Sequence, residues 1–166
     1  MNPVKIYRSG LVRRYHQNPE MSQFGQNNAA HQWGCAMLLL ILHPSPSHDL
    51  LVFTLTHDVG EIDAGDLANP TKNRNPELTE MLRQFEEASR AETLGDRLET
   101  YRHVKDHADE WLYLVDKLEA VLFTITHHPN LTKSRGWPDQ IDMCFSLAEE
   151  LGCGDTVREL IRGCRL

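Results

Sequence analysis

The chain has 166 residues, with 17 Lys and Arg against 24 Asp and Glu, which gives a formal net charge of −7. That length predicts one domain, residues 1–166, large enough to fold without disulfides or a structural metal. The acidic balance argues against binding a nucleic-acid polymer or an anionic membrane, because both need a basic face. No apolar run approaches the roughly 18 residues of a membrane span, and signal-peptide and CxxC patterns are missing, so we expect a cytoplasmic protein.

Helical patterns run through the whole chain, and the β-branched alternation typical of strands is missing. Asn27 and Asn28 can cap the first helix, and Asp49 can cap the second. Pro and Gly residues mark the remaining boundaries. The sequence therefore predicts an all-α bundle of five to six helices, at about residues 29–42, 50–60, 76–94, 104–127 and 138–152, with a short sixth from 155.

The second predicted helix ends in two polar residues, His57 and Asp58. The helix is apolar nearly all round, so both side chains are expected to be buried, and a buried carboxylate is costly unless it is paired or binds a metal. Glu61 shares a face with His57 if the helix continues for one more turn. A lone His-Asp pair is weak evidence, because many occur by chance.

Two further polar residues lie on apolar helix faces. His31 shares its face with Cys35, and on its own would be interpreted as a core imidazole bonded to a backbone carbonyl. Asp116 lies on an apolar stripe and needs a cationic partner. Lys117 is rotated from it by about 100° around the helix, so we expect the partner to come from elsewhere or to be a metal cation.

Together these residues predict a metal site made of two imidazoles and two carboxylates from three helices. Such a set suits a divalent transition metal (Zn, Co or Mn, with Fe also possible by ligand type), and Mg is the remaining alternative. A divalent ion lowers the pKa of water and polarises a phosphoryl oxygen, which assists the hydrolysis of phosphoesters.

The order of these motifs resembles the HD-domain phosphohydrolases, most closely their 5′-deoxynucleotidase branch. QNNAAH at residues 26–31 resembles the branch's Asn-x-x-x-His segment, and HDVGEIDAGDL at 57–67 with PTK at 70–72 resembles its HD-x-x-E-x-x-x-G-D-L…P-x-K block. LVDKLEA at 114–120 resembles its V-x-x-A-D-x-L-x-A helix, although Val115 replaces the usual Ala. RRYHQNP at 13–19 is similar to the start of compact phage HD proteins, including dATP triphosphohydrolases.

The resemblance implies a role for each matching residue. The metal ligands would be His31, His57, Asp58 and Asp116. Glu61 would act as general acid and base. Arg14 would bind the phosphate nearest the cleaved bond, with Arg13 as the alternative.

Four further residues would bind the rest of the substrate. Asp66 would accept a hydrogen bond from the sugar 3′-hydroxyl, and Lys72 would support phosphate charge or, alternatively, be exposed in its loop. Tyr15 and Trp33 would line the sugar or base, although such aromatic residues more often belong to the core.

The leading hypothesis is a dNTP triphosphohydrolase, with dATP as the candidate substrate, that breaks the bond between the α-phosphorus and the 5′ oxygen. Activity on dNMPs or dNDPs is also expected. The alternatives are a dNMP-specific 5′-deoxynucleotidase, a ppGpp hydrolase, and a non-catalytic helical module that binds metal or nucleotide. The expected partners are a deoxynucleotide and further copies of the chain in a homo-oligomer, in the host cytoplasm if the protein is phage-encoded.

Two histidine pairs stay outside these assignments. His103 and His107 are spaced by one helical turn and could form a second metal site, but their acidic neighbours favour a solvated face. His127 and His128 end a predicted helix, where a favourable interaction with the helix C-terminus is expected.

Overall fold

The computed structural model describes residues 1–134 and 136–164, apart from the side chains of residues 69, 70, 106 and 107. The described chain is helical, and its only extended pairing is an isolated bridge between Arg13 and Asn27. This confirms the all-α prediction and exceeds the expected five to six helices. Within the described residues the eight α-helices are α1 (Pro3–Ser9), α2 (Asn28–Leu42), α3 (His48–Thr56), α4 (Asn69–Arg74), α5 (Pro76–Leu94), α6 (Leu98–His127), α7 (Trp137–Glu150) and α8 (Gly154–Gly163).

The fourth predicted helix, α6, begins at Leu98, six residues before its expected start at 104. The second predicted helix also differs from its expected bounds. Its cap is Ser47, whose side chain accepts a hydrogen bond from the N–H of Leu50, and not Asp49. The α-helix stops at Thr56, and a 3₁₀ helix, η2 (Val59–Ile62), follows it. The predicted one-turn continuation past His57 is therefore replaced by a tighter turn.

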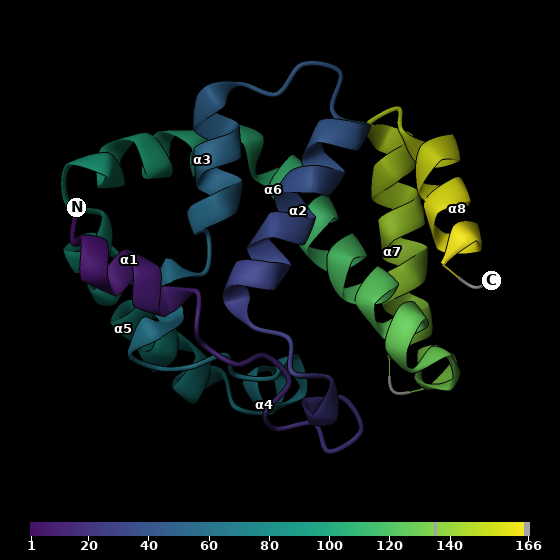
Figure 1. Ribbon diagram of the computed structural model, residues 1–166, viewed down its shortest axis with the longest axis horizontal. Coiled ribbons are helices and arrows are strands. Elements are labelled where there is room, and N and C mark those ends of the chain that lie inside the picture. Colours follow the sequence, from purple (N-terminus) through teal and green to yellow (C-terminus); the bar gives the residue numbers. More distant parts are fainter. Residues whose placement is uncertain (135, 165–166) are drawn as a thin grey trace.

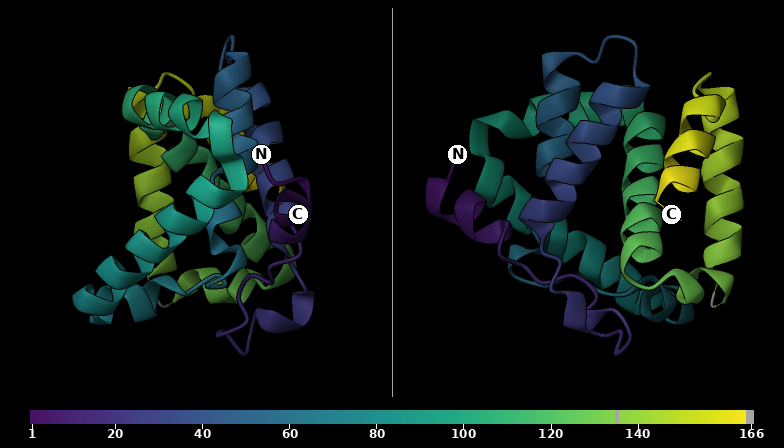
Figure 2. Two further views of the ribbon diagram at one scale, coloured as in Figure 1. Left: turned by 90° about the vertical axis from the view of Figure 1, so that its left-hand side faces the viewer. Right: turned by 45° about the vertical axis from the view of Figure 1, so that its right-hand side comes forward.

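The long helix α6 is the centre of the bundle. Ala108 has non-helical backbone angles (φ −144°, ψ 23°), so α6 is kinked near its first third. The helix packs against α2, α3 and α7. Figure 1 shows α7 and α8 at the right of the molecule, α1 and α5 at the left and α4 at the bottom. Figure 2 shows α2 and α3 close together next to α6.

The apolar core follows from this packing. Residues of α2, α3, α6, α7 and α8 form one buried cluster, in which the side chains of Leu39, Leu114, Leu118 and Val157 are fully enclosed. The polar residues of the predicted metal site lie next to this apolar cluster and do not form a layer of their own. No helix of the described residues has both the length and the apolar character needed to cross a bilayer.

Helix α5 packs closely on η2 because position 60 is a glycine. A Cβ at Gly60 would lie 2.5 Å from the backbone oxygen of Glu86, closer than any real contact. From the same helix, the buried Arg90 donates to the backbone oxygen of His57 at 3.2 Å and lies over the ring of Tyr101. The turn that carries His57, Asp58 and Glu61 is thus held against α5.

Candidate metal centre

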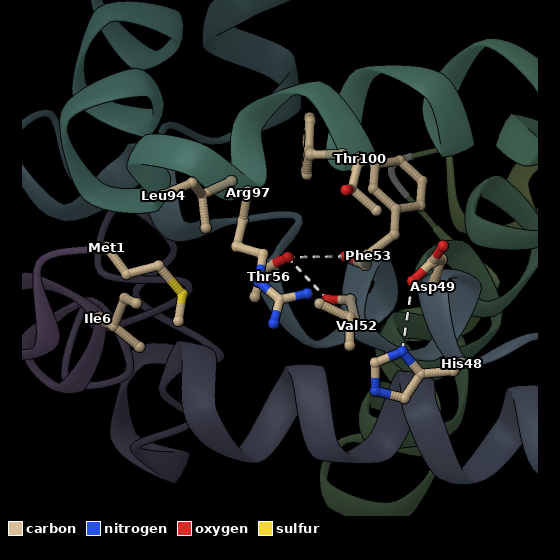
Figure 3. Close-up of a pocket in the computed structure, with 11 residues that line it drawn as sticks. Met1, Ile6, His48, Asp49, Val52, Phe53, Thr56, Leu94, Arg97 and Thr100 are labelled. Carbon is tan, nitrogen blue, oxygen red and sulfur yellow. Dashed lines mark hydrogen bonds and ion pairs between the residues drawn. The ribbon is translucent and has the colours of Figure 1, made fainter.

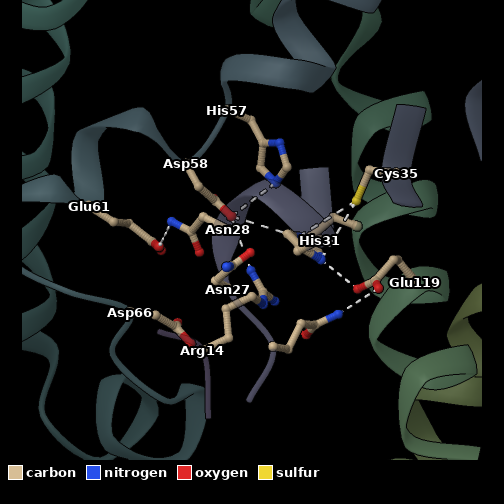
Figure 4. Close-up of polar contacts among 12 residues, drawn as sticks. Arg14, Asn27, Asn28, His31, Cys35, His57, Asp58, Glu61, Asp66 and Glu119 are labelled. Atoms are coloured by element: carbon tan, nitrogen blue, oxygen red, sulfur yellow. Dashed lines mark hydrogen bonds and ion pairs between the residues drawn. The ribbon is translucent and has the colours of Figure 1, made fainter. Parts of the chain in front are cut away.

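The predicted metal ligands come from three elements that meet beside the core. His31 lies in the first turn of α2, His57 caps the end of α3, Asp58 precedes η2, and Asp116 lies in the second half of α6. The Nε2 atom of His31 is 3.1 Å from Oδ1 of Asp116 and 3.7 Å from Oδ2 of Asp58. The Nε2 atom of His57 is 3.3 Å from the same Oδ2 of Asp58. Figure 4 shows both imidazoles and Asp58 directed at one point.

Both imidazoles present Nε2 to that point because their Nδ1 atoms are engaged elsewhere. Nδ1 of His57 lies 2.7 Å from the backbone oxygen of Thr54, and Nδ1 of His31 lies 2.5 Å from Oε2 of Glu119. A carbonyl or a carboxylate can only accept, so each Nδ1 carries a proton, and Nε2 is the nitrogen left for a metal ion. The buried Nε2 of His57 makes no well-aligned hydrogen bond, although Asp58 lies nearby, and this fits a metal ligand.

The spacing of the donor atoms fits one metal ion. One ligand atom each from His31, Cys35, His57 and Asp116 lies within 4.8 Å of the others. Ligands around a tetrahedral zinc ion, at bonds of about 2.0–2.3 Å, are separated by roughly 3.3–3.8 Å. The group must therefore contract by about 1 Å to hold an ion, and Asp58 lies at its edge against both imidazoles.

The electrostatics of the group reflect two opposed effects. Burial lowers the pKa of His57, but Asp58 and Asp116 outweigh it and raise that pKa to about 9. Burial raises the pKa of Asp58, but His57 and Arg14 outweigh it and hold that pKa far below its usual range. The site thus favours positive charge at its centre, as a cation-binding group must.

One expectation about Asp116 was wrong. We expected no local partner, yet Nζ of Lys117 lies 2.6 Å from Oδ2 of Asp116. The long lysine side chain reaches back around the helix despite the 100° rotation between adjacent residues. Oδ1 of Asp116 still faces His31, so each carboxylate oxygen contacts a different group.

Glu61 lies in the turn after Asp58 and is 7% exposed. Its Oε2 accepts a hydrogen bond from Nδ2 of Asn28 at 2.9 Å. Burial, together with the charges of Asp58 and Asp66, raises the pKa of Glu61 to about 8. A carboxyl group with a pKa near neutrality can both take and return a proton at physiological pH.

Arg14 and Tyr15 border the site from the segment before α2. Nη1 of Arg14 lies 3.0 Å from Oδ2 of Asp58, and its backbone N–H donates to the oxygen of Gln26. Tyr15 has a φ of +56°, a left-handed conformation that aromatic residues seldom adopt. The backbone N–H of Tyr15 donates to Oδ2 of Asp66 at 3.3 Å, and the ring of Tyr15 stacks on Phe123.

The remaining predicted substrate residues lie further out. Trp33 is two residues, about 200°, around α2 from His31. It is 63% exposed, and the structure does not bring it together with the site. Lys72 lies in α4, and its positive charge opposes the rise that burial causes in the pKa of Glu86. The side chain of His107 lies outside the described residues.

Three residues of the site were missed from the sequence. Asn28 was interpreted only as a helix cap, but Asn27 caps α2 and Asn28 is buried against Glu61. Cys35 was noted as a neighbour of His31 and not as part of the ligand group. Glu119 lies three residues after Asp116, a spacing that puts both on one helix face and could have identified it.

A separate hollow of about 210 Å³ lies between α1, α3 and the start of α6. Figure 3 shows that Met1, Ile6, Val52, Phe53 and Leu94 supply much of its wall. None of the predicted ligands or catalytic residues lines it. Among the described residues, the predicted metal ligands and catalytic residues therefore lie outside this hollow.

The all-helical fold, with a histidine, a His-Asp pair and an aspartate facing one another beside a buried glutamate, agrees with the expected HD-domain phosphohydrolase. The family model of YfbR-like 5′-deoxynucleotidases matches residues 6–122. The chain belongs to this family and is a hydrolase.

Comparison with solved structures supports the fold over nearly the whole chain. The HD phosphohydrolase DatZ of cyanophage S-2L, bound to dA and one catalytic Zn²⁺ ion, superposes with a TM-score of 0.67. The two chains are 21% identical, and the match covers 96% of this chain and 98% of DatZ. A comparison with curated protein sequences gives no match.

Replacing Asn28 with Ala is expected to move the acidic limb of the pH–rate profile to higher pH. The amide stabilises the charged form of Glu61, so its loss raises a pKa that is already elevated and leaves less base at a given pH. The measurement is kcat against pH for both proteins. Asn27→Ala, which removes only the cap of α2, is the control and should cost about 1 kcal/mol of stability without moving the limb. If the acidic limb does not move in Asn28→Ala, Glu61 is not the base that titrates there.

Proposed function

We propose that this protein hydrolyses deoxynucleotides at the α-phosphate, with a divalent metal at the group formed by His31, His57, Asp58 and Asp116. The preferred substrate is a deoxynucleoside triphosphate, with dATP as the candidate, and the products are a deoxynucleoside and triphosphate. The observation that carries the proposal is the buried Glu61, with a pKa raised to about 8, beside a cation-binding group.

Each residue of the site has a distinct part in this reaction. When bound, a divalent ion lowers the pKa of water and polarises a phosphoryl oxygen. Glu61 takes a proton from the attacking water while a bond forms to the α-phosphorus and the bond to the 5′ oxygen breaks. The same carboxyl group returns the proton to the 5′ oxygen of the leaving deoxynucleoside.

Arg14 contributes the positive charge that the phosphate requires. Its guanidinium is largely buried and paired with Asp58. Its planar donors can bind phosphate oxygens from the same place. Asp66 is proposed to accept from the 3′-hydroxyl, and it also holds the backbone of Tyr15 next to Arg14. Lys72 is proposed to meet the outer phosphates from α4.

Two observations favour different chain lengths of the phosphate. The family model is that of 5′-deoxynucleotidases, which favours a deoxynucleoside monophosphate. The phage-like RRYHQNP segment favours our choice of the triphosphate, and the dA bound to DatZ favours adenine as the base. Both reactions use the same bond to the 5′ oxygen, so one site can perform both.

The ligand types limit the metal. Two imidazoles favour Zn, Co or Mn over Mg, which prefers a shell of oxygen ligands and water. The DatZ structure contains a catalytic Zn²⁺ ion. Zinc is therefore our first choice for this chain.

A panel of dNMPs, dNDPs, dNTPs and NTPs with Zn, Co, Mn and Mg tests the function. We expect dATP to give deoxyadenosine and triphosphate, resolved from phosphate by ion-exchange chromatography. Glu61→Ala should lower kcat by roughly 10²- to 10⁴-fold because the proton acceptor is lost. Glu77→Ala, an exposed glutamate of α5, is the control and should leave kcat unchanged. Phosphate as the sole product would favour the monophosphate alternative, and equal rates in the two variants would remove Glu61 from the mechanism.

Replacing Asp66 with Ala is expected to lower the preference for deoxynucleotides over ribonucleotides. The carboxylate fixes the sugar through its 3′-hydroxyl. Without the carboxylate the sugar is held less closely, so a ribonucleotide with its 2′-hydroxyl is excluded less strongly. The readout is the ratio of kcat/KM for dATP and ATP. Asp63→Ala removes a nearby carboxylate that pairs with Lys5 outside the site and serves as the control. An unchanged ratio in Asp66→Ala would exclude Asp66 from sugar selection.

We also propose that copies of the chain associate through the outer face of α2. Trp33, Leu40 and Ile41 are 63%, 50% and 55% exposed, and their spacing puts them on one stripe with Met37. Such a stripe is typical of an interface. Sedimentation should give a homo-oligomer that Trp33→Asp with Ile41→Asp converts to monomer. A monomeric parent protein would refute the association.

A further inference from the structure

A second buried carboxylate, Glu119, lies behind His31 on the side away from Asp116. It projects from α6 and is 9% exposed. Its Oε2 lies 2.5 Å from Nδ1 of His31, while its Oε1 accepts from Nε2 of Gln26 at 2.7 Å. Figure 4 shows Glu119 reaching from α6 to the ring of His31. Both oxygens of this carboxylate are therefore engaged inside the protein.

We propose that Glu119 is the positioning residue of the metal centre, which fixes the tautomer and the ring orientation of His31. This inference rests on the proposed metal site but concerns a residue that does not touch the ion. The torsion that rotates an imidazole is soft and nearly two-fold, so a ring without an outer partner can present either nitrogen or neither. The carboxylate holds a proton on Nδ1 and leaves Nε2 as the nitrogen that faces Asp116 and Asp58.

The two imidazoles are held by partners of different strength. His57 donates to the neutral backbone oxygen of Thr54 in its own helix, whereas His31 donates to an anion from another helix. A charged acceptor forms the stronger hydrogen bond and also raises the basicity of the ring as a ligand. His31 therefore depends on the packing of α2 against α6, which the geometry of His57 does not require.

Gly34 makes the space that Glu119 occupies. It lies one turn after His31 in α2, and a Cβ there would come within 2.8 Å of Cγ of Glu119. Glycine inside a helix costs about 1 kcal/mol relative to alanine, so the residue is unfavourable for α2 itself. The close passage of Glu119 gives this glycine a function.

Gln26 fixes the other end of the carboxylate. It is 5% exposed, and its backbone oxygen accepts from the N–H of Arg14 at 3.0 Å. A single residue thus connects the proposed phosphate ligand, Arg14, to the carboxylate behind a proposed metal ligand. The chain Arg14–Gln26–Glu119–His31 joins the segment before α2 to the metal centre through hydrogen bonds alone.

Zinc affinity measured by competition with a chromophoric chelator tests the proposal without relying on turnover. We expect Glu119→Ala to weaken zinc binding by roughly 10- to 100-fold, the usual effect of losing an outer partner of a ligating histidine. Glu119→Gln keeps an oxygen acceptor and should lose less. Gly34→Ala keeps the carboxylate but displaces it, so affinity should fall even though alanine favours the helix. Thr124→Ala, another fully buried polar residue of α6 outside the group, is the control and should bind zinc as the parent does.

Nitrogen chemical shifts of the histidine rings in the zinc-loaded protein give a second readout. In the parent, His31 should show protonated Nδ1, and in Glu119→Ala it should show a mixture of tautomers. Parent-like zinc affinity and tautomer in a folded Glu119→Ala protein would overturn the proposal. If circular dichroism shows that this variant does not fold, Glu119→Gln and Gln26→Ala take its place. Parent-like zinc affinity and tautomer in both of these variants would likewise overturn the proposal. Normal zinc binding and tautomer effects with no hydrolysis would sink the proposed reaction but not the role of Glu119.

Discussion

The structure depends on bringing four carboxylates into a small buried region without leaving any one unpaired. Asp58, Asp116, Glu61 and Glu119 come from two segments far apart in the sequence, and like charges at such distances repel strongly in a medium of low dielectric constant. Asp58 pairs with Arg14, and Asp116 pairs with Lys117. Glu61 accepts from Asn28, and Glu119 contacts His31. Even so, the region still attracts positive charge, as the raised pKa of His57 shows. A bound cation relieves this excess and at the same time supplies the chemistry.

The need to bring these groups together explains features that the apolar core alone would not require. Two glycines lie where backbones or side chains must pass closely: Gly60 against α5 and Gly34 against Glu119. Arg90 is buried so that its guanidinium can hold the backbone of the His57 turn from α5. The positions of the ligands therefore depend on helix contacts on every side of the site.

Much of the fold was predictable because periodicity and capping are local. The bounds of α2, α5 and α7 agree with their predicted ranges within one or two residues. The 3₁₀ turn at Val59–Ile62 was not predictable, because it results from the contact with α5. Of the site, the metal-ligating residues could be proposed from buried polar residues on apolar faces, and the geometry brings them together, although their roles stay predictions. Side-chain partners such as Asn28 and Lys117 depend on reach and on the approach of helices, which a sequence pattern does not specify.

The packing of Gly34 on Glu119 has a consequence for how this site can change by mutation. With the glutamate present, any side chain at position 34 disturbs the histidine's support; with the glutamate gone, the glycine only weakens its helix. Each single replacement is therefore harmful from this starting point, whereas both together restore a well-formed helix around a differently supported metal ligand. We expect divergence at these two positions to be correlated, with related sequences keeping the pair or replacing both.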